Sequence, residues 1–410
     1  MKLGILGTDA AIARMVAAAA ARGDTVSLAC EIEADDAAAS IPGVPREPWQ
    51  ALLDPRSCDA ILVGADGWTE ARADAVRALV QAGRTLLLSH PLVLSMLWYY
   101  ELDMIRTDSG ARLIPLLPDR LHPFIARLRQ RVEAGLAGTD PLGPVEAISM
   151  ERRLADRSRT AVLAALATDV DLVRVLVGDP GRLSTLGGAD ADTAWNTLAV
   201  GFSGPDVVPV RWQVVRGEPL GLKITLSHAH GTTSVEIPAH PAATAGSGSG
   251  SAWTWSGPPR ESQDYDDARV LLDVLHGATG EEAGVPAAAW PDAARAVELA
   301  ETVPRSLAKG RAIDLHQEEF SELGTFRGTM ASLGCGLVLA ALVVVVLATL
   351  VGGIAREAGW AWGERLAGGW PYLVLAVLGL FLMLQFVPLL AGVQPTPSSK
   401  GNSSRRPGRE

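Results

Sequence analysis

The sequence predicts an α/β protein with three parts. Residues 1–120 are expected to form a parallel sheet covered by helices, and residues 121–315 an α+β domain with an open sheet. A two-helix transmembrane hairpin is expected to follow. Three observations predict this order: apolar runs that alternate with helix-like stretches, a series of strand-like runs after one helix, and two long charge-free stretches near the end. A length of 410 residues fits two domains with an appendage.

Charge and cysteine content exclude several classes of protein. The net charge of −10 excludes a nucleic-acid-binding surface, which needs a basic patch. The three cysteines occur without a CxxC motif or a nearby histidine cluster. This pattern excludes a disulfide framework and gives no zinc signature, so we expect neither a nucleic-acid partner nor a metal site.

The first part alternates between buried-strand and helix patterns. Each apolar run is four to seven residues long and each helix-like stretch follows a glycine or a polar residue, which is typical of parallel βαβ units. The expected strands are Lys2–Leu6, Thr25–Glu31, Asp59–Val63 and Arg84–Leu88, and the expected helices are Ala10–Arg22 and Glu70–Ala82.

The second part contains several strands in succession. Helices are expected at Phe124–Leu136 and Arg159–Val177, and a closing pair at Asp264–Leu275 and Trp290–Lys309. The expected strands are Val145–Arg152, Asn196–Phe202, Val208–Val215, Leu222–His228 and Thr232–Ile237. The Gly/Ser-rich stretch Ala242–Pro259 is interpreted as a flexible loop. Strands in series after one helix indicate an open antiparallel or mixed sheet.

Two stretches are long and apolar enough to cross a bilayer. Ala331–Ile354 and Trp370–Val393 each hold 24 residues without a charge. A helix of that length spans about 36 Å at roughly 1.5 Å per residue, and the hydrocarbon core is about 30 Å thick. The second stretch contains Gln385 and Pro388, which membrane helices tolerate. We therefore expect a lipid bilayer as a partner, reached through a polar linker at residues 316–330.

Lysine and arginine counts orient the expected hairpin. Four basic residues follow the second span in a basic, disordered tail (394–410), and Arg311 and Arg327 precede the first span. The loop between the spans carries only Arg356 and Arg365. The positive-inside rule then places both termini in the cytoplasm. Met1 and Lys2 lead directly into a strand pattern, so no signal peptide is expected.

The first strand-to-helix turn resembles a dinucleotide-binding fingerprint. Such a turn needs glycines so that the backbone can approach a pyrophosphate resting on the helix N-terminus. Gly7 occupies the first glycine position, but the second and third fall on Asp9 and Ile12. Glu31 ends the second expected strand, where an acid would bind the ribose hydroxyls. Taken alone, the pattern also fits an ordinary strand–helix turn.

The wider pattern resembles the Gfo/Idh/MocA oxidoreductase family from residue 2 to about residue 315. The resemblance rests on GILGTDAAIA at the first turn, CDAILVGADGWTEARADAVRALVQAGRTLLLSHP, RLHPFIARLRQRVEAG, GPVEAISMERR, DLVRVLVGDP and WPDAARAVELAETVPRSLAKGRAIDL, in that order. It implies a Rossmann-type domain, a second domain with an open sheet, and a closing helix at 290–309 that returns to the first domain. It also implies NAD or NADP as cofactor and pairing of two copies through the second-domain sheet.

The resemblance also implies a set of site residues. Three substrate-binding positions match Arg120, Thr168 and Asp171. The cofactor-binding positions match Gly7, Thr8, Asp9, Ile12, Glu31, Ser89, His90 and Pro91.

This chain departs from the family at the positions that carry its chemistry. The family's E-K-P segment supplies a lysine for proton transfer, and here the segment is Ser89-His90-Pro91. The family's D-x-x-x-H motif falls on Ala164 and Thr168, neither of which is a base near neutral pH. His90 is then the one candidate catalytic residue, because an imidazole exchanges protons near pH 6.5. The alternative is a histidine with no chemical role at a strand end.

Two further clusters have alternative interpretations. Asp169 and Asp171 could form a carboxylate pair that contacts a substrate or a metal, or could cap a neighbouring loop. His228 and His230 share one strand face and His240 follows, but no third ligand has a convincing spacing. We therefore interpret these histidines as part of a solvated sheet face.

Three functions remain open from the sequence. The first is a membrane-anchored, catalytically degenerate relative of the family with a binding or assembly role. The second is an active NAD(P)-dependent oxidoreductase of a sugar or polyol, in which His90 replaces the usual lysine. The third is a scaffold whose cleft is empty and whose dimer surface carries the function. In the first and third, Asp9 opposes cofactor binding through its charge and its side chain.

Overall fold

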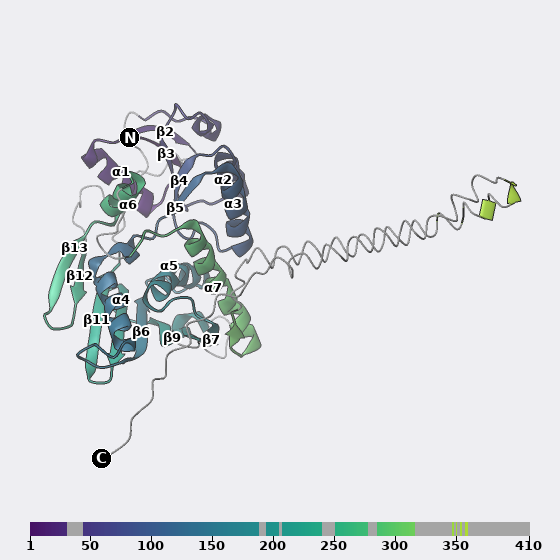
Figure 1. Cartoon of the computed structure of the whole chain (residues 1–410). Coiled ribbons are helices and arrows are strands. Elements are labelled where there is room, and N and C mark those ends of the chain that lie inside the picture. Colours follow the sequence, from purple (N-terminus) through teal and green to yellow (C-terminus); the bar gives the residue numbers. More distant parts are fainter. Residues whose placement is uncertain are drawn as a thin grey trace, which may run out of the picture. The chain divides into compact units, whose positions relative to one another are not determined.

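A five-stranded parallel sheet forms the first half of the chain (Figure 1). Its strand order is β2-β1-β3-β4-β5, and every neighbouring pair runs parallel. The strands are β1 (Lys2–Leu6), β2 (Thr25–Cys30), β3 (Ala60–Val63), β4 (Thr85–Leu88) and β5 (Arg112–Pro115). Their continuous apolar runs fit a sheet that is buried on both faces. The order reverses between β1 and β3, and in such sheets ligands bind at the carboxyl ends of the strands at this point.

The computed structural model describes residues 1–30, 44–187, 194–204, 207–239, 251–277 and 285–315, together with a few positions between 347 and 359. Residues Met1–His316 form one compact unit. Glu31, the expected ribose-binding acid, lies outside the described residues. So do His240 and the first half of the expected flexible loop, residues 242–250.

Helices cover both faces of the parallel sheet. Leu3, Ile5 and Leu62 pack in one core with α1 (Ala10–Arg22) and α6 (Asp267–Leu275). The alternate side chains of the same strands pack in the other core with α2 (Glu70–Gln81) and α3 (Met96–Ser109). The side chains of a strand point alternately to the two faces, which explains the two separate cores. Figure 1 shows α6, from far along the chain, lying beside α1.

A nine-stranded sheet forms the second half, in the order β13-β12-β11-β10-β6-β9-β8-β7-β14. Only β6 and β9 run parallel, and the other neighbouring pairs are antiparallel. The strands are β6 (Val145–Arg153), β7 (Arg182–Leu186), β8 (Ala199–Gly204), β9 (Val207–Val215), β10 (Gly221–His228), β11 (Gly231–Pro238), β12 (Ser251–Trp255), β13 (Glu261–Tyr265) and β14 (Ile313–Asp314). This is the mixed, open sheet that the sequence predicts.

Three helices build the layer on this second sheet. They are α4 (Pro123–Leu136), α5 (Arg159–Val177) and α7 (Trp290–Lys309). Both α4 and α5 contact the sheet, and α7 packs on α5, β7 and α3. Short 3-10 turns, η1 (Trp49–Leu53), η2 (Pro118–Leu121) and η3 (Ala194–Thr197), connect the larger elements. Helix α7 thus contacts α3, one of the helices that cover the first sheet.

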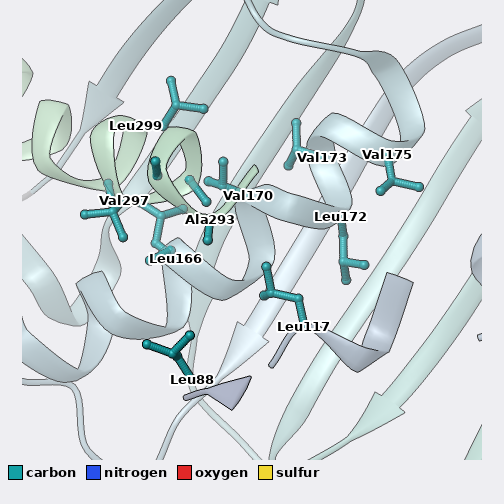
Figure 2. Packing of buried hydrophobic residues seen from close by; sticks show 14 of the residues in the cluster. Leu88, Leu117, Leu166, Val170, Leu172, Val173, Val175, Ala293, Val297 and Leu299 are labelled. Atoms are coloured by element: carbon teal, nitrogen blue, oxygen red, sulfur yellow. The ribbon is translucent and has the colours of Figure 1, made fainter. Parts of the chain in front are cut away.

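Helix α5 carries a long row of buried apolar side chains (Figure 2). Leu166, Val170 and Val173 are fully enclosed, and Figure 2 shows them between the sheet and Val297 of α7. The helix is well defined at both ends. The Ser158 hydroxyl accepts a hydrogen bond from the Ala161 N–H, and Gly178 ends the helix with a φ of 80°.

Several sequence-based expectations were wrong or incomplete. The stretch Ala242–Pro259 contains β12, because Trp253 and Trp255 alternate inward and bury large aromatic surfaces. The helix expected from Asp264 begins at Asp267, and its first expected residues belong to β13. The sequence analysis also missed α3, β5 and β7. The division of the unit at residue 120 remains a prediction.

The expected membrane segments lie almost wholly outside the described residues. The linker 316–330, the span 370–393 and the tail 394–410 lie entirely outside, and the span 331–354 contributes only a few isolated positions. Among the helices that the structure does describe, none has both the length and the apolar character needed to cross a bilayer. The hairpin therefore stays a prediction.

The burial of α5 predicts a large effect of truncating its core side. Leu166→Ala removes a side chain that is 0% exposed, so we expect a loss of about 2–5 kcal/mol in the free energy of unfolding. Leu97→Ala is the control, since Leu97 is 75% exposed and should change stability by less than about 0.5 kcal/mol. Urea unfolding of both variants measures the difference. Equal effects would contradict the central position of α5.

Candidate functional site

A cavity of about 230 Å3 lies at the carboxyl ends of the parallel strands. Its polar lining comes from six elements or their ends: Arg14 of α1, His90 after β4, Asp119 of η2, Arg152 of β6, Thr168 of α5 and Asp267 of α6. Side chains of α6 close the remaining side. The site therefore forms where the two sheets and their helices meet, at the crevice that the strand order predicts.

The β1–α1 turn is built around the carboxylate of Asp9. Its Oδ1 accepts a hydrogen bond from the Ile12 N–H at 2.9 Å, which caps α1. Its Oδ2 accepts the Ala65 N–H at 2.8 Å, from the loop that follows β3. Asp9 thus places a negative charge on the positive end of the helix and fastens the turn to the neighbouring strand. The turn therefore contains a negatively charged group of the chain itself, the Asp9 carboxylate.

An arginine side chain packs on the glycine of the same turn. Gly7 has a φ of 67°, and a Cβ there would lie 2.5 Å from the Arg72 guanidinium carbon. Arg72 is only 6% exposed and donates to the backbone carbonyls of Gly64 at 3.3 Å and Asp66 at 2.5 Å. A Cβ on Gly64 would lie 2.4 Å from the backbone of Thr8. The turn is therefore packed on both sides by protein atoms.

His90 is held by hydrogen bonds on both ring nitrogens. Its Nδ1 lies 3.4 Å from the Tyr99 hydroxyl and its Nε2 lies 3.3 Å from the Ala167 carbonyl oxygen. The Tyr99 oxygen accepts the Leu92 N–H at 3.1 Å, so its hydrogen is free for Nδ1. Because a carbonyl only accepts, Nε2 must carry the proton. His90 is then a neutral imidazole that joins β4 to α5.

Burial lowers the pKa of His90 to about 4, and its hydrogen bond with the Ala167 carbonyl only partly offsets this. A base for chemistry near pH 7 would need a pKa near that value. The expected role of His90 as an acid/base residue at neutral pH therefore meets an unfavourable environment, although its ring does line the cavity. The imidazole ring is also packed edge-on against Tyr99.

The structure brings some of the predicted site residues together and separates others. Thr168 lies beside His90 and donates weakly to its carbonyl oxygen, at 3.5 Å. Arg120 and Asp171 pair with each other at 3.0 Å and line a different cavity, of about 340 Å3. Ser89 is buried, and the peptide bond between His90 and Pro91 is cis. The predicted substrate-binding set is thus divided between two cavities.

Asp169 and Asp171 do not form the carboxylate pair that was one of the two interpretations of the sequence. Residues two apart on a helix point in different directions, and each carboxylate has its own guanidinium. Asp169 is paired with Arg152 in two contacts and accepts the indole N–H of Trp212 at 2.8 Å. The sequence analysis missed both of these partners, which come from β6 and β9. No local pattern in the sequence indicates that the Asp169 carboxylate is buried against two strands.

No metal site is formed by the described residues, among which no group of three His, Cys, Asp or Glu side chains gathers. The Nδ1 of His228 lies 3.3 Å from the Gly143 carbonyl oxygen, and His230 is exposed. His228 is buried, so the expectation that it lies on a solvated face was wrong for this residue.

Comparison with solved structures identifies the fold. A myo-inositol dehydrogenase from Corynebacterium glutamicum is 16% identical, with a TM-score of 0.55 over 77% of this chain and 99% of its own. An oxidoreductase from Agrobacterium radiobacter, solved with NAD+, L-tartaric acid and magnesium, is 12% identical, with a TM-score of 0.56 over 77% and 98%. A UDP-N-acetylglucosamine 3-dehydrogenase from Acidithiobacillus ferrooxidans is 17% identical, with a TM-score of 0.55 over 75% and 97%.

The chain has the fold of these dehydrogenases. Nearly the whole length of each solved structure matches this chain. The matched share of this chain is about the share that the unit Met1–His316 occupies. At these identities the likeness concerns the fold alone. No family model matches the sequence, and no curated protein matches it.

The low pKa of His90 predicts a specific pH dependence of stability. The folded state holds this imidazole neutral while the unfolded chain protonates it near pH 6.5. The contribution is present above pH 6.5 and is lost as the pH falls through about 4. At pH 5 the loss in unfolding free energy amounts to about 2 kcal/mol. We expect His90→Gln to reduce the drop in unfolding free energy between pH 7 and pH 5 by up to that amount.

Urea unfolding of the full chain at the two pH values measures this difference. His230→Gln is the control, since that histidine is exposed and should leave the drop unchanged. His122 will retain part of the acid sensitivity in every variant, because burial also lowers its pKa to about 4. An unchanged drop in His90→Gln would contradict a neutral, buried His90.

Proposed function

We propose that this chain is a divergent, membrane-anchored relative of the Gfo/Idh/MocA oxidoreductases, with a closed dinucleotide site and a binding or assembly role. The observation that carries this proposal is the Asp9 carboxylate, which accepts the N–H groups of Ile12 and Ala65 at the N-terminus of α1. In dinucleotide-binding folds this is where the pyrophosphate rests.

The residues present do not fit a dinucleotide in the ordinary position. The Asp9 carboxylate repels a pyrophosphate and its side chain occupies the helix end. Arg72 is buried on Gly7 and its Nη1 donates to two backbone carbonyls, so its guanidinium fills the space beside the first glycine of the turn. The cavity of about 230 Å3 is also smaller than the roughly 300–1,000 Å3 typical of sites for drug-sized ligands.

The acid/base positions support the same conclusion. Ala164 and Thr168 stand where the family has its D-x-x-x-H motif, and the Thr168 hydroxyl donates to the Ala164 carbonyl at 3.3 Å. His90 is fully engaged by Tyr99 and Ala167. A proton transfer at neutral pH would need one of these contacts to break and the pKa of the imidazole to rise from about 4 toward its ordinary value.

The anchor and the self-association surface complete the proposal. Two 24-residue charge-free stretches support a hairpin in the cell membrane with both termini cytoplasmic. The outer face of the second sheet carries small side chains such as Ala147, Ser184 and Gly201 beside the exposed Leu186. These exposed, small side chains support a homodimer through that sheet.

A second candidate is an active NAD(P)-dependent oxidoreductase of a sugar or polyol. Two observations favour it. His90 does line the cavity at the carboxyl ends of the strands. Structural neighbours include one protein solved with NAD+ and one described as NADPH-dependent. In this alternative, Asp9 would move on cofactor binding and His90 would replace the family's lysine.

Cofactor titration separates the two functions. We expect the full chain, purified in detergent, to bind NADH and NADPH with a Kd weaker than about 100 μM (about −5.5 kcal/mol). Asp9→Gly frees two backbone donors and removes a charge, so we expect it to gain at least about tenfold in affinity. Fluorescence of the reduced nicotinamide measures both. Tight binding by the unchanged chain would instead support the active oxidoreductase.

Asp59→Gly is the matched control. Its carboxylate also accepts one backbone N–H, from Lys2 at 2.7 Å, but it precedes β3 and so lies at the amino end of the sheet. It should not change cofactor affinity. Equal affinity of Asp9→Gly and Asp59→Gly would contradict the role assigned to Asp9.

A further inference from the structure

An apolar stripe lies exposed on helix α3. Its members, Leu97, Tyr100 and Met104, are 75%, 37% and 65% exposed. Spacings of three and four residues put them on one face of the helix. The opposite face supplies the buried Tyr99 and Leu102, so the stripe is not part of the core. Single exposed apolar residues are normal on a protein surface, but three on one helix face form a patch of the kind that contacts a partner.

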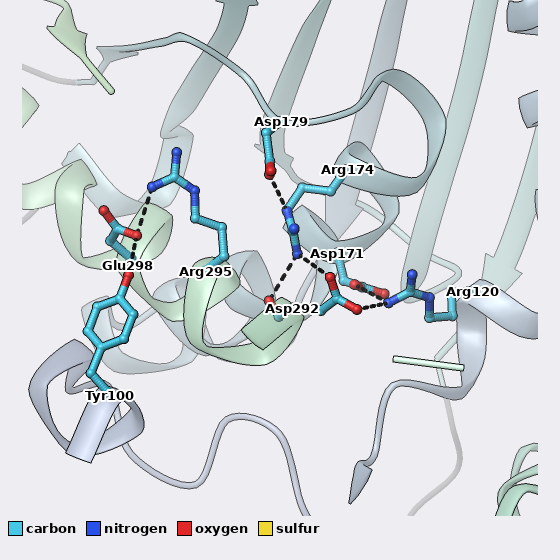
Figure 3. A network of polar contacts seen from close by, with 8 residues as sticks. All are labelled: Tyr100, Arg120, Asp171, Arg174, Asp179, Asp292, Arg295 and Glu298. Atoms are coloured by element: carbon cyan, nitrogen blue, oxygen red, sulfur yellow. Dashed lines mark hydrogen bonds and ion pairs between the residues drawn. The ribbon is translucent and has the colours of Figure 1, made fainter. Parts of the chain in front are cut away.

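The stripe borders the exposed face of α7. The Tyr100 hydroxyl donates to Glu298 at 2.9 Å, and Figure 3 shows these two side chains meeting between the helices. The Met96 N–H donates to Glu301 at 3.0 Å. Because residue 96 lies beside residue 301 and residue 100 beside residue 298, the two helices run antiparallel. Leu97 therefore lies at the end of the stripe that is nearer to the C-terminus of α7.

Basic side chains gather at that end of α7. Arg305 and Lys309 are exposed, and a spacing of four residues puts them on one face of the helix. The exposed Arg311 follows directly after the C-cap residue Gly310. Within the described residues, none of these three side chains forms an ion pair. The end of α7 therefore presents three unpaired cations beside the apolar stripe.

Most acidic side chains around this surface already have cationic partners. Glu298 pairs with Arg295 at 2.8 Å, and Asp314 of β14 pairs with Arg182 at 2.8 Å. Along α3, Glu101 and Asp103 pair with Arg77 and Arg106. Glu301 lies at the N-terminal end of α3, where the helix dipole favours a negative charge. Three cations therefore face one carboxylate at this end, so it is net positive.

The place where the chain leaves this unit favours a bilayer as the partner. The unit ends at His316, five residues after Arg311, and the first charge-free stretch begins at Ala331. Residues 317–330 reach at most about 50 Å even when fully extended. A short tether gives a millimolar effective concentration at its anchor, so even a weak affinity of the surface for lipid is sufficient.

An anionic leaflet matches both parts of the surface. Tyrosine favours the headgroup level of a bilayer, and leucine and methionine side chains insert beside it. Lysine and arginine side chains near the surface are attracted by anionic lipid. The tether itself contains three glutamates and one arginine, so it cannot cause a preference for anionic lipid.

We propose that the surface formed by the α3 stripe and the C-terminal end of α7 docks on the anionic leaflet of a bilayer. Leu97, Tyr100 and Met104 enter the headgroup region, and Arg305, Lys309 and Arg311 contact lipid phosphates. The docking rests on the membrane anchor of the proposed function, and it goes further by giving the folded unit one orientation at the membrane.

Lipids with a nitroxide on the acyl chain test the docking in the full chain, reconstituted in phosphatidylcholine vesicles with or without phosphatidylserine. Leu97→Cys carries a bimane label in a Cys335→Ser background. Cys30 and Cys58 are each 1% exposed, so they do not take up the label in the folded protein. We expect strong quenching of the label at residue 97 by the nitroxide, and more with phosphatidylserine than without it.

Gln263→Cys is the control for position. Gln263 is exposed on β13, at the edge of the second sheet opposite to β14. A label there should be quenched much less than the label at residue 97.

Charge reversal tests the basic end of the surface. Lys309→Glu/Arg311→Glu should lower the ratio of docked to undocked chains at least tenfold, since each basic residue near an anionic leaflet contributes roughly fivefold. Arg216→Glu/Arg260→Glu makes the same change of charge at exposed positions that follow β9 and β12. It should leave the quenching at residue 97 unchanged.

Extraction with alkaline carbonate separates failure of the anchor from failure of the docking. A full chain that is extracted from the vesicles would overturn the anchor and the docking together. A chain that resists extraction would still overturn the docking alone in three cases: equal quenching at residues 97 and 263, quenching that does not depend on phosphatidylserine, or equal effects of the two charge reversals. A label at residue 97 that is shielded from water without lipid quenching would assign the stripe to a second copy of the chain, and would also overturn the docking.

Discussion

The described structure depends on the pairing of two carboxylates that α5 carries into the protein interior. Asp169 and Asp171 are 0% and 1% exposed, and unpaired charges at such positions would be strongly destabilising. Asp169 binds Arg152 of β6 and the Trp212 indole of β9. Asp171 binds Arg120 of η2, which in turn binds Asp292 of α7. These contacts join the helix to the second sheet on one side and to the closing helix on the other.

The same helix separates the two cavities. Thr168 contributes to the cavity at the carboxyl ends of the parallel strands, and Asp171, one turn later, contributes to the other. The first cavity has polar groups engaged by the protein itself: Arg14 pairs with Asp267, Arg152 pairs with Asp169, and His90 is held by Tyr99 and Ala167. The second is lined by three arginines and three acidic side chains that pair with one another. The two cavities thus share one helix but have different linings.

In the proposed function, the internal contacts of the β1–α1 turn let the fold persist without a bound dinucleotide. In this fold a bound pyrophosphate normally neutralises the helix end and stabilises the turn. Asp9 supplies the same negative charge from within the chain and also binds the loop after β3. Arg72 fills the remaining space on Gly7. The turn is thereby satisfied by internal contacts, and the fold can be retained for association or for binding elsewhere.

The sequence by itself determined most elements of the fold, because their signals are local. Helix α1 was predicted at its observed bounds, since a polar N-cap, an alanine-rich stretch and Gly23 mark both ends within a few residues. Five residues around β12 were misassigned, because its buried Trp253 and Trp255 lie next to a Gly/Ser-rich stretch that suggests a loop.

The resemblance also identified Gly7, Asp9 and His90 as positions in or beside the crevice. Only the tertiary structure decided what each of them contacts. The Ala65 N–H on Asp9, Tyr99 on His90 and Arg120 on Asp171 come from other elements of the fold. Burial, shared arginines and the division of the site into two cavities arise when segments distant in the sequence pack together. A sequence pattern within one segment therefore cannot predict these features.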